Sequence, residues 1–310
     1  MDSKYLNDPS GYLCGSYIEI QSCHFTAGLD PGISHNDFVM AMQSTDTVPH
    51  LITVGDASLP GIVFLHGFLG SGRDWLPFAE SLSDRFQCLL PDLPGHGASR
   101  SRDQTGPMAF HNAALGLLEA ISNVRNGPVH LAGYSMGGRM ALYLALKFPR
   151  RFISATIISA APGLRTDEER RERRVHDEML AAELEQDPIG FFERWYRLPL
   201  FASLAALPSF PDILAARLAG NPKTLASSLR ALGTGNQPSL WDNLPDNRLP
   251  IMFCAGEKDS KFVEIDRQMV NLCPCSSLEI FAGCGHTLHF ENRTMFLDRL
   301  TYFINNHRHS

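Results

Sequence analysis

Residues 129–147 read VHLAGYSMGGRMALYLALK, and this stretch decides the fold. Its apolar start predicts a buried strand, and the alanine- and leucine-rich run from Arg139 predicts a helix. Gly133 and Gly137 stand two residues to either side of Ser135, where a larger side chain would block a sharp turn from strand into helix. The pattern therefore predicts that the Ser135 hydroxyl is held clear of the end of a sheet.

Other strand signals surround this turn on both sides. The apolar run at residues 61–65 ends in HGFLGS, and the run at 87–90 ends in PDLPGHG, so each reads as a strand leading into a glycine-rich loop. Helical sequence separates several of these runs. Further apolar runs lie at 153–159, 250–255 and 277–281, and a closing helix is expected at about 294–305. Alternating strands and helices predict an α/β protein with a mostly parallel central sheet and helices on both faces.

The strand signals stop between residues 163 and 244, where helix-forming, arginine-rich sequence takes over. We interpret 163–244 as an inserted helical cap, with 56–162 and 245–310 forming one core. Residues 1–55 show no clear period, and they fit either an N-terminal extension or a pair of edge strands. One catalytic unit is expected, since a chain of 310 residues can form one core with an insertion.

Composition limits the class of protein. The net charge of −6 argues against a nucleic-acid or anionic-membrane partner, because both favour a basic surface. No apolar run approaches the roughly 18–20 residues needed for a membrane span, and the first thirty residues do not resemble a secretion signal. Seven cysteines without a CxxC pair are typical of reduced thiols. We expect a soluble protein in a reducing compartment.

A serine hydroxyl needs a base within hydrogen-bond reach and a carboxylate to orient that base. Asp259 and His286 follow the last two expected strands, in the order Ser, Asp, His that the α/β-hydrolase fold uses. These three residues are the predicted catalytic triad. Glu257 could orient the base instead, although a structural role fits it better, and His289 could line the site or cap a helix.

Two backbone amides are expected to form an oxyanion hole beside Ser135. In this fold one comes from the residue after the serine, here Met136, and the other from the loop after the first core strand, here Phe68. The chain has no metal-ligand cluster, dinucleotide loop or Walker sequence, so we expect neither a metal nor a cofactor.

Arginine is the informative residue for the substrate class. Arg139 follows the serine turn directly, and the cap segment carries Arg170, Arg171, Arg173, Arg174, Arg194 and Arg217. Guanidinium groups bind carboxylates in a planar fork, so several around one pocket would suit a small polycarboxylate. The alternation of acids and bases at 168–174 also fits a solvated helix face with weak ion pairs.

The sequence resembles the 2-succinyl-6-hydroxy-2,4-cyclohexadiene-1-carboxylate synthases of menaquinone and phylloquinone biosynthesis over about residues 61–303. The runs that carry the resemblance are LHGFLGSG at 65–72, GYSMGGR at 133–139, WY at 195–196, PLFASL at 199–204, GNQPSLW at 235–241, GEKDSKF at 256–262 and GH at 285–286 with His289 and Glu291. The first two occur in many α/β-hydrolase-fold proteins. The cap runs and DSKF at 259–262 are more specific.

The resemblance implies a carbon–oxygen lyase in which the triad removes a proton and the substrate expels pyruvate. It implies that Arg139, Arg173, Arg217, Tyr134 and Trp195 bind the substrate. It also implies an enzyme of the cytoplasm or the plastid stroma, and the N-terminal stretch, which bacterial members do not need, is compatible with association or fusion with other pathway enzymes. Two other functions stay open: a serine hydrolase of esters or carbon–carbon bonds, and a slow-turnover ligand receptor.

Overall fold

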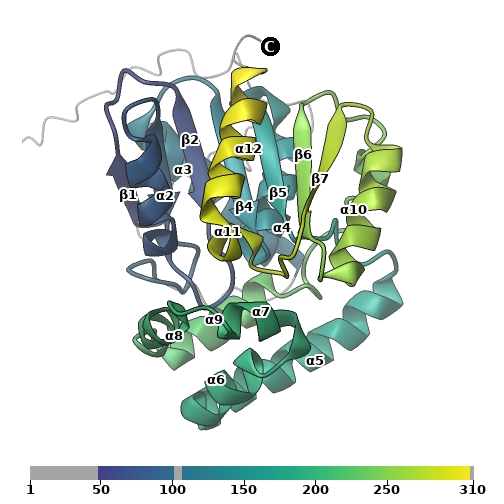
Figure 1. The fold of residues 1–310 in the computed structure, drawn as a ribbon. Coiled ribbons are helices and arrows are strands. Elements are labelled where there is room, and N and C mark those ends of the chain that lie inside the picture. Colours follow the sequence, from purple (N-terminus) through teal and green to yellow (C-terminus); the bar gives the residue numbers. More distant parts are fainter. Residues whose placement is uncertain (1–47, 101–106, 308–310) are drawn as a thin grey trace, which may run out of the picture.

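The computed structural model describes residues 48–100 and 107–307, and they form a seven-stranded sheet with helices on both faces (Figure 1). The strand order is β1-β3-β2-β4-β5-β6-β7, in which β1 pairs antiparallel with β3 and all other pairs are parallel. The strands are β1 (Leu51–Val54), β2 (Gly61–Leu65), β3 (Gln87–Pro91), β4 (Val129–Tyr134), β5 (Phe152–Ile158), β6 (Ile251–Gly256) and β7 (Ser276–Phe281). The mostly parallel sheet predicted from the sequence is confirmed.

Both faces of the sheet are covered, which explains why β2, β3, β4 and β6 are buried along their whole length. Side chains alternate along β2: Val63 and Leu65 belong to the core that includes residues of α3 and α4, whereas Ile62 and Phe64 belong to the core that includes residues of α2 and α12. Around the sheet lie η2 (Gly72–Trp75), α2 (Leu76–Leu82), α3 (Pro107–Val124), α4 (Met136–Lys147), η3 (Pro149–Arg151), η5 (Trp241–Asn243), α10 (Ser260–Leu272), α11 (Leu288–Glu291) and α12 (Arg293–Asn305).

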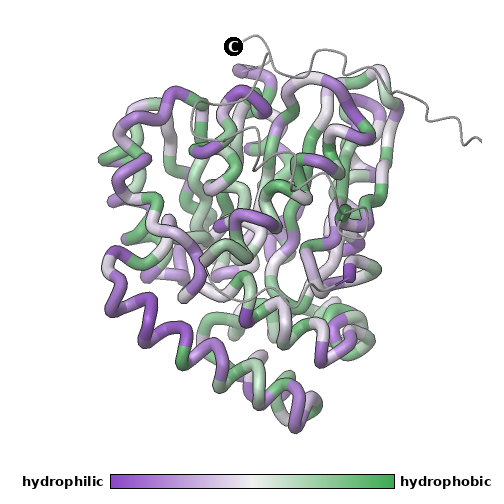
Figure 2. Tube along the Cα trace, turned by 180° about the vertical axis from the view of Figure 1, so that it is seen from behind, coloured by the Kyte–Doolittle hydropathy of each residue, from purple (hydrophilic) through white to green (hydrophobic). Residues whose placement is uncertain are grey.

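A separate group of helices lies across one end of the sheet, below it in Figure 1. We call α5 to α9 the helical layer; it consists of α5 (Asp167–Gln186), α6 (Pro188–Tyr196), η4 (Pro199–Phe201), α7 (Ala202–Ala205), α8 (Phe210–Leu218) and α9 (Pro222–Leu232). It has its own apolar cluster, which includes Leu184, Phe191 and Leu225. Figure 2 shows hydrophobic residues along the strands and a hydrophilic first half of α5. The helices of the layer thus pack together through the side that carries this apolar cluster.

The N-terminal region and the surface are described only in part. Leu51–Val54 form an edge strand, while the expectation for residues 1–47 lies outside the described residues.

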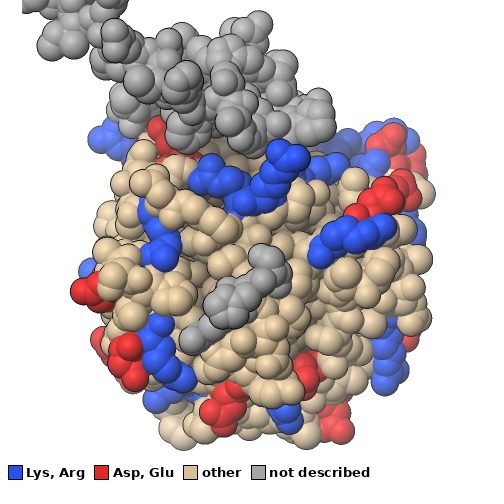
Figure 3. Space-filling model, turned by 90° about the horizontal axis from the view of Figure 1, so that it is seen from above, with Lys and Arg blue, Asp and Glu red and all other residues tan. Residues whose placement is uncertain are grey.

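On the visible part of the face opposite the helical layer, Lys and Arg form separate groups with uncharged surface between them (Figure 3). Within 48–100 and 107–307, no single helix is long and apolar enough to cross a membrane, although the bent pair Pro199–Ala205 and Phe210–Leu218 passes by length and composition. The five described cysteines are free.

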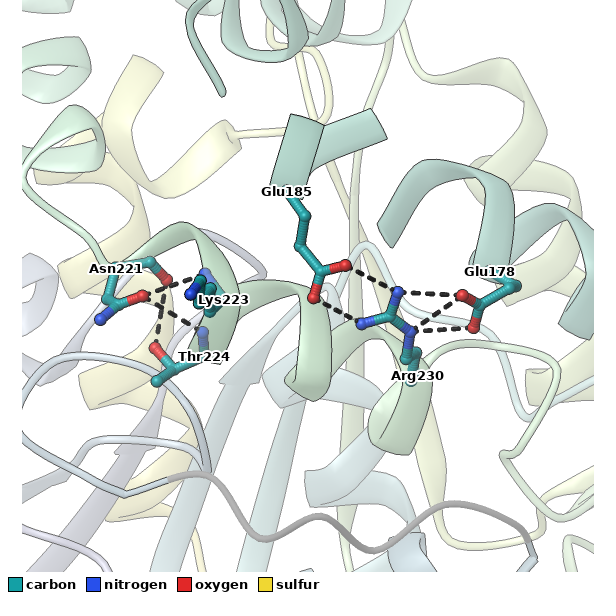
Figure 4. A network of polar contacts seen from close by, with 6 residues as sticks. All are labelled: Glu178, Glu185, Asn221, Lys223, Thr224 and Arg230. Carbon is teal, nitrogen blue, oxygen red and sulfur yellow. Dashed lines mark hydrogen bonds and ion pairs between the residues drawn. The ribbon is translucent and has the colours of Figure 1, made fainter. Parts of the chain in front are cut away.

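An arginine holds two helices of the layer together (Figure 4). Arg230 of α9 donates from Nε and Nη2 to Glu178 and from Nη1 and Nη2 to Glu185, both on α5. Asn221 caps the other end of α9 by accepting from the amides of Lys223 and Thr224. The carboxylates beside Arg230 raise the pKa of its guanidinium. The Arg230 contacts fix α9 against α5, whereas the Asn221 contacts stay within α9 and end the helix.

Arg230→Met should lower the free energy of unfolding by about 1 kcal/mol, because the partly exposed pairs lose charge-assisted hydrogen bonds while the apolar stem is kept. Urea denaturation measures the change. Arg197→Met is the matched control, since Arg197 is 78% exposed and has a single long contact of 3.6 Å with Glu193. Equal stability of the two variants would contradict a role for Arg230 in holding the layer.

Candidate active site

The turn at Ser135 joins β4 to α4 and has a strained backbone. Ser135 has φ 51° and ψ −110°, a region that residues other than glycine rarely adopt. A Cβ on Gly133 would lie 2.4 Å from the carbonyl oxygen of Gly137, and one on Gly137 would lie 2.3 Å from that of Leu65. Both glycines are therefore required, and the strain lifts the serine hydroxyl off the end of the sheet.

Ser135, His286 and Asp259 are brought together from three separate segments. His286 Nδ1 lies 2.6 Å from Asp259 Oδ2, and His286 Nε2 lies 3.3 Å from Ser135 Oγ. An ionised carboxylate only accepts, so Nδ1 carries the hydrogen and Nε2 can accept the serine proton. Asp259 and His286 are buried, at 6% and 2% exposure. The arrangement is that of a serine hydroxyl coupled to an oriented base.

The two rival residues have other contacts. Glu257 is exposed, and its Oε2 accepts the amide of Gly283 at 2.8 Å. His289 is buried, with its ring centroid 4.8 Å from that of Trp75 and 4.4 Å from that of Tyr134. Glu291 holds the loop of the base, because its carboxylate accepts from the amides of Gly285 and Thr287.

The loop after β2 reaches the serine turn. A Cβ on Gly67 would lie 3.6 Å from Ser135 Cβ, so Phe68, the next residue, lies close to the serine. Met136 is the first residue of α4, where the amide has no carbonyl partner within the helix. Both residues thus lie in segments that meet at Ser135, and their roles as oxyanion donors stay a prediction.

Three side chains outside the predicted catalytic and substrate-binding residues hold this loop. His66 Nε2 accepts the amide of Leu93 at 2.9 Å, and His96 Nε2 accepts that of Leu69 at 3.2 Å. Asp92 Oδ1 accepts the amide of Gly72 at 2.7 Å. His66 Nδ1 and His96 Nδ1 each face a backbone carbonyl, so both rings are neutral with the hydrogen on Nδ1. His96 and Asp92 lie in the PDLPGHG run, the only sequence signal for them.

Burial lowers the pKa of His66 and, further, that of His96, whose pKa the neighbouring His66 also lowers. The unfolded chain, with a pKa of 6.5 for these groups, therefore binds more protons than the folded chain below that pH. The stability they contribute is present above pH 6.5 and is lost as the pH falls toward the folded-state values.

His96→Gln should reduce this loss, because the amide oxygen can still accept from Leu69 but does not titrate. The slope of unfolding free energy between pH 6.5 and 5 should become shallower by up to about 1.4 kcal/mol per pH unit. Urea titrations at each pH measure it, with His176→Gln, on the helical layer, as control. An unchanged slope for His96→Gln would show that this ring does not resist protonation.

The three arginines that the resemblance selects differ in their partners. Arg217 Nη1 donates to Asp74 Oδ1 at 2.6 Å, and Arg173 Nε donates to Asp177 Oδ1 at 2.7 Å. Arg139 is 9% exposed, and its side-chain hydrogen bond within the described residues goes to the neutral amide oxygen of Gln237, at 3.3 Å.

These partners set the pKa values. Burial lowers the pKa of Arg139 to about 10, with the more distant Asp177 opposing the change. Burial also disfavours the charged form of Arg217, but Asp74 and Tyr196 outweigh it and raise its pKa. Among the residues that the structure describes, Arg139 is thus a buried cation without a carboxylate contact, directly behind the serine turn.

The remaining predicted residues also face the site. The ring of Tyr134 lies 5.4 Å from that of His286, and burial raises the pKa of its hydroxyl. Trp195 of α6 meets Phe68 edge to face at 5.5 Å, so the helical layer touches the loop after β2. Arg170 and Arg174 instead bond carbonyl oxygens of Leu164 and Gly235.

A hollow of about 500 Å³ opens beside His286 and Asp259, between η4–α7 and the start of α10. Ser203, Lys258 and Lys261 line it. In the part of the chain that the structure describes, no group of three or more His, Cys, Asp or Glu side chains is placed to hold a metal ion.

Comparison with known proteins places this site in a family. The model of the alpha/beta hydrolase family matches residues 62–299. A 2-succinyl-6-hydroxy-2,4-cyclohexadiene-1-carboxylate synthase of Citrobacter koseri is 33% identical, over 81% of this chain and 96% of its own. The structure of MenH from S. aureus has a TM-score of 0.79 and 33% identity, over 84% of this chain and 99% of that one.

A longer plant relative matches as well. "Protein PHYLLO, chloroplastic" of Arabidopsis thaliana is 34% identical over 84% of this chain, and the chain spans only 16% of that protein's length. The similarity to the shorter relatives, in contrast, runs over nearly their whole length. The chain belongs to the alpha/beta hydrolase family and, within it, to the family of 2-succinyl-6-hydroxy-2,4-cyclohexadiene-1-carboxylate synthases.

Proposed function

We propose that this protein converts 2-succinyl-5-enolpyruvyl-6-hydroxy-3-cyclohexene-1-carboxylate into 2-succinyl-6-hydroxy-2,4-cyclohexadiene-1-carboxylate and pyruvate. The observation that carries the proposal beyond the shared triad is Arg139, which lies on α4 four residues after Ser135 and whose buried guanidinium has an amide oxygen as its side-chain hydrogen-bond partner among the described residues. A buried cation is costly unless an anion joins it. A carboxylate of the substrate would be such an anion, and the Citrobacter koseri relative is named as a synthase of a carboxylate.

The reaction needs a base and a stabilised oxyanion, which this geometry supplies. The Ser135–His286 pair takes the proton from the ring carbon that bears the succinyl group, and the carbonyl oxygen next to that carbon gains the negative charge. The amides of Phe68 and Met136 stabilise this enolate. Its electrons then form the new double bond, the existing one shifts, and the carbon–oxygen bond to the enolpyruvyl group breaks. The leaving group takes up a proton and becomes pyruvate.

This route needs neither an acyl-enzyme nor water as a reactant, which separates it from ester hydrolysis on the same fold. Asp259 keeps Nδ1 of His286 protonated and stabilises the imidazolium that forms. The guanidinium of Arg139 orients a carboxylate of the substrate and takes no part in the proton transfer.

The test is to mix purified protein with freshly generated substrate and to follow pyruvate release together with diene absorbance. We expect both signals to rise together, well above the uncatalysed rate. A rate equal to the uncatalysed one would overturn the assignment. Turnover of a simple aryl ester with a covalent acyl-enzyme, detected by mass spectrometry, would establish the hydrolase alternative.

We also propose that the protein acts in the cytoplasm or the plastid stroma, in contact with other enzymes of its pathway. The support is that the chain is similar both to free-standing bacterial proteins and to a sixth part of a chloroplastic one. Imaging of the full-length protein with a fluorescent tag, with pull-down of neighbouring enzymes from the same cells, tests both statements. Exclusion from both compartments would refute the first, and purification as a lone chain the second.

A further inference from the structure

An ion pair connects the core to the helical layer next to the site. Asp74 lies in η2 and Arg217 lies near the end of α8, 143 residues later, and Asp74 Oδ1 accepts from Arg217 Nη1 at 2.6 Å. Their side chains are 13% and 8% exposed. A charge-assisted hydrogen bond shielded from water is directional, so the pair restricts where the guanidinium can lie.

Both ends of this pair are held by further contacts. Asp74 Oδ2 accepts the amide of Ser71 at 3.4 Å and lies so close to Gly70 that a Cβ there would come within 2.3 Å of it. Tyr196, a buried residue of α6, is the other group that raises the pKa of Arg217, so it lies near the guanidinium. The guanidinium is thus hydrogen-bonded to the core through Asp74 and has Tyr196 of the layer nearby, and only the core contact brings a negative charge.

A guanidinium has five N–H donors in a fixed plane, so the bond to Asp74 and the neighbouring Tyr196 leave donors for a third group. We infer that Asp74 is a positioning residue, which with Tyr196 holds Arg217 so that its remaining donors face a carboxylate of the substrate. The inference rests on the proposed function for the identity of that substrate. It adds that the guanidinium supplied by the layer takes its orientation from the core, so substrate binding by Arg217 needs the layer to be docked on the core.

The test compares Asp74→Ala with Asp74→Glu, measuring kcat and KM for pyruvate release. Asp74→Ala frees the guanidinium, and misplacing a binding group by about 1 Å can cost up to about a hundredfold, so we expect KM to rise about tenfold with kcat nearly unchanged. Asp74→Glu keeps the carboxylate and should restore most of the loss. Asp212→Ala, which removes an exposed acid from α8 itself, should match the wild type.

Tyr196→Phe serves if Asp74→Ala fails to fold, because it removes one hydroxyl at constant ring volume; KM should again rise. An unchanged KM with lower thermal stability would reduce Asp74 to a structural role and overturn the inference. A fall in KM would overturn it too, since Asp74 would then compete with the substrate for Arg217.

Calorimetric titration with succinate, a simple dicarboxylate, separates this inference from the proposed function. If the wild type releases no pyruvate but succinate still binds more weakly to Asp74→Ala than to the wild type, the positioning role stands. That result would overturn the proposed function alone. Turnover by the wild type, with equal KM and equal succinate affinity in Asp74→Ala, would overturn the positioning role alone.

Discussion

Replacing Ser135 with alanine should slow pyruvate release by about a thousandfold or more, as removal of one member of a catalytic triad does in related chemistry. The hydroxyl lies 3.3 Å from His286 Nε2, so its loss removes the group that connects the base to the substrate proton. His286→Ala should have an effect of the same size, and the double variant should be little slower than either, because the two act as a unit. Pyruvate release under single-turnover conditions measures all three rates.

The matched control is Ser81→Ala, on the exposed side of α2. It should match the wild type in rate and stability. A Ser135→Ala rate within about tenfold of the wild type would mean that Ser135 is not part of the base, since general base catalysis contributes at least about a hundredfold.

Replacing Arg139 with alanine should lower kcat/KM by about a hundredfold, mainly through KM, while the free energy of unfolding stays the same or rises. Activity and stability should change differently because Arg139 is buried and has no carboxylate contact in the described part of the chain. Its removal therefore relieves a poorly compensated charge and at the same time removes a substrate contact. A residue needed only for packing would lose stability together with activity. Kinetics and urea denaturation of one protein preparation measure both.

Arg139→Lys should recover little activity, because an ammonium group cannot form the planar two-point contact with a carboxylate. Arg150→Ala, an exposed arginine after the same helix, is the control and should be neutral. A wild-type KM in Arg139→Ala would contradict a role for Arg139 in substrate binding, and the proposed function would lose its main support.

The part of the fold that the sequence predicts is the part with a local signal. The expected strand at 153–159 is β5 at Phe152–Ile158, and the closing helix expected at 294–305 is α12 at Arg293–Asn305. The helices α3 and α10 were not predicted, although each packs on the sheet. α3 follows a polar stretch and α10 begins directly after Asp259, so both are amphipathic helices whose start lacks a separate local signal.

The residues of the site also divide into those with a local sequence signal and those without one. Ser135, Asp259 and His286 stand in short motifs at strand ends, where the fold itself fixes their neighbours. Asp74 carries no motif, and Gln237 lies in the GNQPSLW run without any sign there of its partner, because their contacts arise from residues 143 and 98 positions away. Asp177 is intermediate: it stands four residues after Arg173, a spacing that predicts an ion pair on one helix, but its bond to the amide of Gly235 is visible only in the folded chain.

The helical layer leaves the sheet after β5 and returns at β6, and these strands are direct neighbours in the sheet. A single helix could make that crossover connection, so the pairing of β5 with β6 does not require this particular group of helices. Protein engineers could therefore exchange the layer as a cassette between scaffolds of this kind. A transplanted cassette would carry Arg217 and Tyr196 but would leave Asp74 and Arg139 behind. Chimaeras should thus fold more readily than they function, unless the recipient scaffold already offers an acid at the position of Asp74.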